Sequence, residues 1–353
     1  MQGRLYVFDI LRALATLAVI GIHVTADYAG ASRWGLFSNQ VVRFAVPMFI
    51  IISGYLLYFQ DMISARREPV VLFYRKRFGK ILWPYVLWTL FYSLVTQYML
   101  HTWPDGLLLL TAVGKHLLWG TGAYHLYFMV IIIQCYLLYP LLKAWIQKHP
   151  SSFLISLLAL CLFCQMILYM NTIGRHALPS VAYPQIYLVA FPIWIGYFGL
   201  GMYMARFKDW IESALASGWL SWAMLWTASL AILLWDSHVT GSYASSGKPT
   251  IMIYAIMSFL FFYSLTLKYG LGGLPFTDWF SRQSFLIYLS HPVVLLFLQR
   301  IVHKLGIPGA WEGAGGMITL YLLTVAITAA AVYCVRNAPL LWLLGGQSGK
   351  PRH

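Results

Sequence analysis

The first apolar segment of the chain contains residues that could do chemistry inside a membrane. Residues 8–23 read FDILRALATLAVIGIH, an apolar run interrupted by an aspartate, an arginine and a histidine. On an α-helix, the step from Arg12 to His23 leaves the two side chains about 20° apart in direction and about 16 Å apart along the axis. One helix face carries Asp9, Arg12, Thr16, His23 and Asp27. An arginine or aspartate at mid-membrane costs about 2.5–3.5 kcal/mol, so we expect this face to line the bundle interior.

This polar face predicts a cation near one end of the segment and an imidazole near the other. His23 suits proton transfer because histidine ordinarily titrates near neutral pH. Asp27 would either orient that ring, as a catalytic-triad carboxylate does, or lie in a solvated loop, and the sequence favours neither. The simpler interpretation is structural: Asp9 pairs with Arg12 near the inner interface, and a neighbouring helix satisfies His23.

The elements that must position these residues are membrane helices. Of the 353 residues, 60% are hydrophobic and only 10% are charged, a composition that indicates a polytopic membrane protein. The formal net charge is +14, but the basic residues lie mainly between apolar runs, which favours membrane orientation over nucleic-acid binding. Cys161 and Cys164 form a C-x-x-C pair inside an apolar run, where a buried structural role is favoured over redox chemistry.

About ten segments are apolar and long enough to cross a bilayer, which predicts an all-α polytopic fold with a polar cavity inside the membrane. With the N-terminus in the cytoplasm, sixteen lysines and arginines fall on the inner side and seven on the outer side. This asymmetry predicts that both termini are cytoplasmic. The predicted spans, of which the sixth and tenth are interrupted by proline or glycine, are 6–27, 41–60, 79–100, 125–145, 152–171, 185–205, 218–236, 250–268, 282–302 and 315–336.

Five short motifs follow one another along the chain. They are Asp9-Ile-Leu-Arg12 with His23, Pro47-Met-Phe with Ser53-Gly-Tyr-Leu, Arg77-Phe-Gly-Lys80-Ile-Leu-Trp-Pro-Tyr85, His125-Leu-Tyr-Phe128, and Ser284 to Pro292 with His291. In this order they resemble the motifs of the acyltransferase 3 family of integral-membrane O-acyltransferases. Lys80 stands where the family's third-helix motif has a second arginine, so a bidentate contact is not expected there.

The resemblance implies an activity and a location. Such proteins move an acyl group, usually acetyl from cytoplasmic acetyl-CoA, to a hydroxyl of a polysaccharide, lipopolysaccharide or related surface glycan. They lie in the bacterial cytoplasmic membrane, and no metal or nucleic acid is implied. Residues 1–345 would form the acyltransferase domain and 346–353 a short cytoplasmic tail. The sequence leaves open the acyl group, the acceptor sugar and the oligomeric state.

Under this interpretation, the two ends of the polar face serve two ends of the acyl donor. The pantetheine arm of an acyl-CoA is about as long as the spacing between Arg12 and His23. Arg12, together with Arg75, Arg77 and Lys80, would hold the phosphates. The alternative for the latter three is ordinary positive-inside topology. His23 would act as general base on the sugar hydroxyl, either directly or through a covalent acyl-histidine.

The remaining candidates lie where an acceptor would arrive. We expect His125 to contact the acceptor and Tyr124 to stack on a sugar ring, although aromatic residues are common at membrane interfaces. His291, with Tyr288 on the same face, is a candidate for acceptor binding or catalysis, or for a buried structural role. Ser53 is interpreted as a small residue that permits close helix packing.

Two other functions also fit the sequence. A transporter of a polysaccharide or lipid-linked sugar would also bury polar groups within many helices. The basic residues gathered at one helix end and the lack of a clear internal repeat favour the enzyme. The second alternative is an O-succinyltransferase of a biofilm polysaccharide, which would need a further cation near His23. Arg43 is the candidate for that role.

Overall fold

The computed structural model describes residues 6–64, 68–101, 106–175, 177–180 and 185–347. In these residues the chain is helical, with no β-strand, which confirms the predicted all-α class. The elements are α1 (Tyr6–Val24), α2 (Arg33–Val41), α3 (Ala45–Ile63), α4 (Val70–Leu100), α5 (Gly106–Trp119), α6 (Tyr127–Lys148), α7 (Pro150–Met170), η1 (Asn171–Arg175), α8 (Gln185–Val189), η2 (Phe191–Ile193), α9 (Ile195–Arg206), α10 (Lys208–Ser217), α11 (Trp219–Thr240), α12 (Pro249–Tyr269), α13 (Pro275–Lys304), η3 (Pro308–Trp311), α14 (Gly313–Cys334) and η4 (Leu341–Leu344).

The number of long apolar helices is close to the expected ten. Within the described residues, eight helices are long and apolar enough to cross a membrane, and a ninth is added if α10 and α11, which meet at 84°, form one span. The predicted span at 185–205 is divided among α8, η2 and α9, because Pro192 lacks the N–H that a continuous helix needs. The predicted interruption of the last span is not found, since α14 is continuous. Residues 348–353 of the predicted tail lie outside the described residues.

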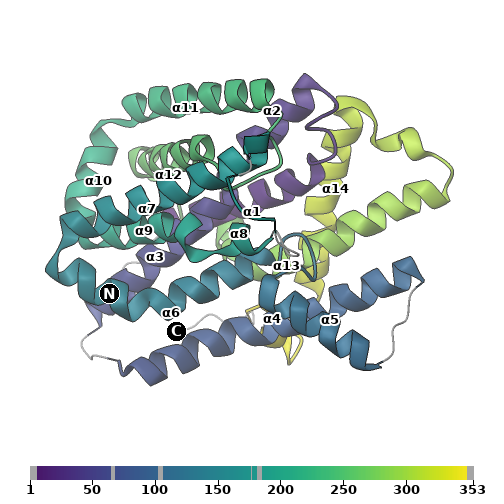
Figure 1. Cartoon of the computed structure of the whole chain (residues 1–353), viewed down its shortest axis with the longest axis horizontal. Coiled ribbons are helices and arrows are strands. Elements are labelled where there is room, and N and C mark those ends of the chain that lie inside the picture. Colours follow the sequence, from purple (N-terminus) through teal and green to yellow (C-terminus); the bar gives the residue numbers. More distant parts are fainter. Residues whose placement is uncertain (1–5, 65–67, 102–105, 176, 181–184, 348–353) are drawn as a thin grey trace.

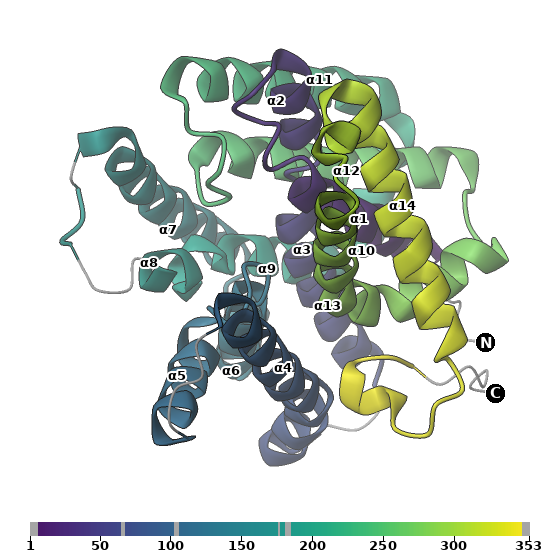
Figure 2. The same ribbon diagram turned by 90° about the vertical axis from the view of Figure 1, so that its right-hand side faces the viewer.

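Helix α1 lies at the centre of the bundle. It packs against α13, α3, α14 and α12, and more than half of its apolar window is buried. Figure 2 shows α1, α3 and α13 in the middle of the molecule, with α14 on one side and α4, α5 and α6 on the other. A central helix has no lipid-facing side along most of its length, so the polar face of α1 faces other helices.

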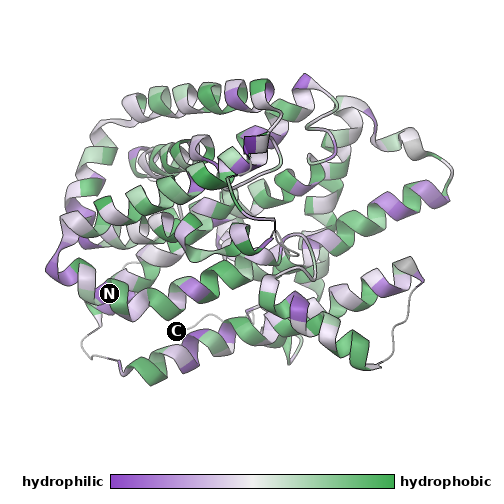
Figure 3. Cartoon of the chain, viewed as in Figure 1, coloured by the Kyte–Doolittle hydropathy of each residue, from purple (hydrophilic) through white to green (hydrophobic). Residues whose placement is uncertain are grey.

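The distribution of polarity is that of a membrane protein. Large apolar side chains such as Trp34, Val71 and Leu110 are exposed, and the outer helices in Figure 3 carry green (hydrophobic) stretches among white and purple ones. Many polar side chains are buried instead, including Asn39 and Lys248, which are 0% exposed. Since lipid tails cannot hydrogen-bond, the polar groups gather inside the bundle.

Helices α3 and α9 approach each other closely at two glycines. A Cβ at Gly54 would lie 2.1 Å from the carbonyl oxygen of Phe198, and one at Gly201 would lie 2.0 Å from that of Ile51. Only glycine permits this backbone contact, which is a common device between membrane helices. The close approach predicted near Ser53 is therefore made by its neighbour Gly54, while the Ser53 side chain lies beside Tyr136 on α6.

Candidate functional site

The polar face of α1 is fixed at its beginning by neighbouring helices. The Ser281 hydroxyl of α13 donates a 2.7 Å hydrogen bond to a carboxylate oxygen of Asp9. One turn on, Arg12 lies within electrostatic range of Asp9 and of the Tyr136 hydroxyl. Thr16 does not extend the polar face toward a ligand, because its hydroxyl donates back to the Arg12 carbonyl at 2.7 Å. These contacts fix the register of α1 against α6 and α13.

Two guanidinium groups lie near the same tyrosine at this end of the bundle. Tyr136 lies within electrostatic range of both Arg12 and Arg77, which come from α1 and α4. Arg77 also donates a 3.1 Å hydrogen bond to Gln60 and is half-buried. Arg75 and Lys80 are exposed on other sides of α4. We call Arg12, Arg77 and Tyr136 the arginine end of the site.

Three imidazole rings meet at the other end of α1. The ring centroids of His23 and His291 are 5.3 Å apart in a stacked arrangement. His125 lies 6.4 Å from His23 and 5.7 Å from His291, with its ring edge-on to both. These side chains come from α1, from α13 and from the loop that precedes α6. We call His23, His125 and His291 the histidine cluster; the structure therefore brings together three of the residues that the sequence singled out.

The proline after His291 determines which ring nitrogen of that histidine is available. Pro292 has no N–H, so the Tyr288 carbonyl in α13 lacks its usual helical partner. The His291 Nδ1 lies 3.2 Å from the Ile287 carbonyl and also close to that of Tyr288. Because carbonyl oxygens only accept, Nδ1 carries the proton. The Nε2 atom is left as a buried acceptor without a partner.

His125 is enclosed by aromatic rings and has no well-formed hydrogen bond. The rings of Tyr92 and Tyr288 each lie 5.2 Å from its own, and it is 1% exposed. Neither ring nitrogen has a partner, although the Leu289 carbonyl is close by. Burial lowers the pKa of His125, which precedes α6, well below its usual value, and the nearby His291 adds to this effect. The ring is therefore neutral near pH 7 and can accept a proton or a hydrogen bond.

Tyrosines hold this cluster in place and cover it. The Tyr288 hydroxyl donates to the backbone carbonyl of His125, and Tyr92 donates at 2.8 Å to that of Leu289. Tyr124 lies against His23, with ring centroids 4.4 Å apart, and is 56% exposed. Tyr124 is thus an exposed ring that lies directly against His23 of the cluster. The Tyr288 hydroxyl thus holds the backbone of His125 in place.

The structure places Asp27 beyond the helix that carries His23. Helix α1 ends at Val24, three residues before the predicted end of the span, and Asp27 is exposed in the following turns. Its charge acts on Tyr28 and Tyr124. This placement matches the solvated-loop alternative more closely than the triad-like one.

A second polar group beside α1 was largely missed by the sequence analysis. Asn39, at the end of α2, donates to the Ile22 carbonyl at 3.1 Å and to the Thr25 hydroxyl at 2.9 Å, and so holds the backbone next to His23. Arg43 in turn donates to the Asn39 side-chain oxygen. The available signal was the polar sequence Ser38-Asn39-Gln40 directly before an apolar run.

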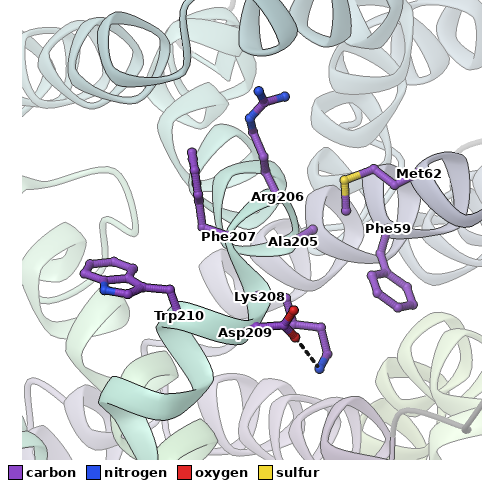
Figure 4. A pocket seen from close by; sticks show the side chains of 8 residues that line it. All are labelled: Phe59, Met62, Ala205, Arg206, Phe207, Lys208, Asp209 and Trp210. Carbon is purple, nitrogen blue, oxygen red and sulfur yellow. Dashed lines mark ion pairs between the residues drawn. The ribbon is translucent and has the colours of Figure 1, made fainter.

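One cavity among the described residues lies away from this chemistry. It has a volume of about 400 Å³ and opens where α3 ends and α9 passes into α10. Figure 4 shows Lys208 turned toward Asp209 within it, at 3.7 Å. Its lining residues are Phe59, Met62, Ala205, Arg206, Phe207, Lys208, Asp209 and Trp210, and none of them is a sequence-predicted site residue. No group of histidine, cysteine or acidic side chains in the described segments has the arrangement of a metal site.

A bundle of apolar helices with a buried polar path along its central helix defines a polytopic membrane protein with an internal site. The chain belongs to the acyltransferase 3 family, whose model, described as an acyltransferase domain, matches residues 5–335. This confirms the resemblance seen in the sequence and shows that the protein is a membrane acyltransferase. No curated protein and no solved structure gives a significant match to the chain.

Proposed function

We propose that the protein moves an acetyl group from acetyl-CoA to a hydroxyl group of a cell-envelope glycan. The observation that carries the proposal is the histidine cluster, in which buried imidazoles with unpartnered nitrogens surround the end of α1. A transferase needs such groups, because the acceptor hydroxyl must lose a proton as it attacks a thioester. The arginine end lies further down the same helix face and suits the phosphates of the donor.

The orientation follows from the charge asymmetry of the sequence. We place the start of α1 on the cytoplasmic side of the bacterial inner membrane, with both termini cytoplasmic. Arg12 and Arg77 then face the compartment that contains acetyl-CoA. The histidine cluster lies toward the outer face, where a glycan acceptor is found, and Tyr124 covers it there. The bilayer and the glycan are the partners that this arrangement requires.

The residues would divide the reaction between them. His23 accepts the proton of the sugar hydroxyl while the hydroxyl oxygen attacks the thioester carbonyl carbon. The carbon–sulfur bond then breaks, and the sulfur of CoA leaves with the electron pair and takes up a proton. The free Nε2 of His291 and one ring nitrogen of His125 accept hydrogen bonds from other sugar hydroxyls, while the remaining N–H of His125 donates one, and together they orient the acceptor. Arg12 and Arg77 hold the donor through its phosphates, whereas the exposed Arg75 and Lys80 contribute little.

The test is acetyl transfer by the purified protein in liposomes. With acetyl-CoA labelled in its acetyl group and extracted envelope glycan, the wild type should label the glycan. Replacing the base in His23→Ala should lower the rate by about 10²–10⁴-fold, the usual contribution of general base catalysis. The melting temperature of the variant in detergent shows whether it is folded.

Two outcomes would contradict the proposal. Equal labelling by the wild type and by folded His23→Ala would remove His23 from the mechanism. Glycan that crosses the bilayer without becoming labelled would indicate a transporter. A lag-free burst of labelled protein, absent from the variant, would show instead that the acetyl group passes through a covalent acyl-histidine.

A further inference from the structure

A buried arginine next to the histidine cluster has most of its hydrogen bonds fixed by the protein. Arg43 is 5% exposed and follows α2 directly. Its Nε and Nη2 atoms donate to the side-chain oxygen of Asn39 at 2.9 and 2.7 Å. Its Nη1 atom donates to the Ala244 carbonyl at 2.9 Å and to the Ser246 hydroxyl at 3.2 Å. A guanidinium has five N–H donors, so one N–H on Nη2 remains for another partner.

A buried lysine lies in the same region and uses all its donors. The Lys248 ammonium donates to the Ser237 hydroxyl at 2.8 Å and to the Ser242 carbonyl at 2.7 Å. Its third partner is the Asp236 carboxylate at 2.8 Å. Lys248 is 0% exposed, and its charge acts on that of Arg43. Lys248 thereby ties the start of α12 to α11 and to the loop between these helices.

The positive charge of this region exceeds the negative charge. Two buried cations, Arg43 and Lys248, stand against one carboxylate, Asp236, which already contacts Lys248. Among the described residues, no acidic side chain lies in contact with Arg43. Burying a charge without a counter-charge is costly, and proteins rarely retain such a charge without a purpose. An anion from outside the chain is therefore expected to complete the site.

The excess charge lies beside the reacting group. The charge of Arg43 acts on His23, and Asn39 links the two by also holding the Ile22 carbonyl. The guanidinium is planar and fixed in direction by four hydrogen bonds, so its remaining N–H points one way and can donate a single charge-assisted hydrogen bond to a carboxylate oxygen. We propose that Arg43 binds a carboxylate group of one of the two substrates while His23 acts at the reacting end of that substrate. This proposal rests on the proposed function.

Two substrates could bring that carboxylate. One is an acyl donor with a second carboxyl group, such as succinyl-CoA, whose free end would point past His23. The other is an acidic acceptor, such as a glycan that contains a uronic acid. Both would place a carboxylate against the same N–H of Arg43. The structure therefore indicates the chemical group that binds, and the experiment shows which substrate carries it.

The experiment compares matched substrates in the liposome assay. One pair is succinyl-CoA and acetyl-CoA with a neutral glycan, and the other is a uronate-containing and a neutral oligosaccharide with acetyl-CoA. The wild type should prefer the carboxylate member of one pair at least tenfold in kcat/KM. Arg43→Gln should lose most of that preference and still act on the neutral member. Arg33→Gln is the matched control, because Arg33 is an exposed arginine of the same α2 segment.

A second variant covers the case in which Arg43→Gln fails to fold. Arg43→Lys keeps the buried positive charge but loses the planar, directed fork of the guanidinium, so it should also lower the preference. The proposal is overturned if the wild type shows no preference in either pair. It is also overturned if Arg43→Gln slows all substrates equally, which would indicate a role at the thioester oxygen instead.

A binding readout separates this proposal from the proposed function. If the wild type transfers no acyl group to any acceptor, the proposed function fails and Arg43 is judged by thermal unfolding alone. Succinate or glucuronate should then raise the melting temperature of the wild type above that in sodium chloride of equal ionic strength, and should not raise that of Arg43→Gln. No rise with either anion overturns the carboxylate site.

Discussion

Two buried polar groups in this membrane bundle are built in opposite ways. In the Asp236–Lys248 pair, all three ammonium donors have partners, and the carboxylate accepts further hydrogen bonds from Tyr169 and Thr250. In the histidine cluster, the acceptor nitrogens of His125 and His291 have none. Both groups are buried and polar. They differ in whether the protein itself supplies their hydrogen-bond partners.

The difference separates a structural role from a functional one. A satisfied buried pair ties helices together, because its loss leaves a charge in an apolar interior. An unsatisfied buried imidazole destabilises the fold on its own and is retained where a substrate completes it. Variants at the pair should therefore change stability, and variants at the cluster should change activity. The predictions that follow test this separation, beginning with the largest expected effect.

The largest effect is expected at the buried ion pair. Lys248→Met removes the ammonium and leaves Asp236 charged and buried, so the free energy of unfolding should fall by about 3–5 kcal/mol. Thermal unfolding of the purified protein in detergent measures the change. The same substitution at Lys268, which is exposed on the same helix α12, is the matched control and should have little effect.

A double variant shows whether charge is the cause. Replacing both partners, in Lys248→Met with Asp236→Leu, should recover more than half of the lost stability, because an apolar pair of similar volume needs no counter-charge. If the double variant is as unstable as the single one, the hydrogen bonds to Ser237 and Ser242 matter more than the ion pair.

The sequence predicted α1 and its polar face well, for a simple physical reason. Helical spacing alone puts Arg12 and His23 on one face, and the cost of a charge in lipid turns that face inward. The family motifs singled out His125 and His291 individually. Their meeting with His23 depends on how α1, α6 and α13 pack, and residues so far apart in sequence carry no local signal of contact.

The parts that could not be predicted depend on tertiary contacts. The exposure of Arg75 and Lys80, against the half-burial of Arg77, follows from which side of α4 faces α6. Pro192 and the glycines of the span at 185–205 indicated an interruption, but not that the span would be divided into three helices. The hydrogen bonds from Gln40 and Arg43 to the loop at 241–248 join segments about 200 residues apart, so no pattern in either segment predicts them.

The next largest effect is expected in the histidine cluster and should fall on activity. His125→Phe fits the cage formed by Tyr92 and Tyr288, removes two unpartnered nitrogens and keeps the backbone carbonyl that Tyr288 uses. Loss of one buried hydrogen bond to substrate costs about 1–3 kcal/mol, so kcat/KM for the acceptor should fall about 10–100-fold. The melting temperature should stay the same or rise, since no hydrogen bond within the protein is lost.

The contrast with a neighbouring tyrosine sharpens this test. Tyr92→Phe removes a hydroxyl that is already bonded to the Leu289 carbonyl, so it should lower the melting temperature more than His125→Phe does. If His125→Phe unfolds more easily than the wild type and Tyr92→Phe does not, the cluster is structural and the comparison with the ion pair fails.

The smallest effect is expected at the arginine end, where two arginines of one helix provide the comparison. The charges of Arg77 and Arg12 both act on Tyr136, whereas Arg75 is exposed. A charge-assisted hydrogen bond to a phosphate contributes about 1.5–3 kcal/mol, so Arg77→Gln should raise the KM for acetyl-CoA about tenfold or more with kcat nearly unchanged. Arg75→Gln is the matched control, because it removes the same charge from the same membrane surface. Since Arg75 is exposed, this variant should change the KM for acetyl-CoA by no more than about twofold. Equal effects of both variants would mean that the two residues act only through the net charge of that surface, and raising the salt concentration would then abolish both effects together.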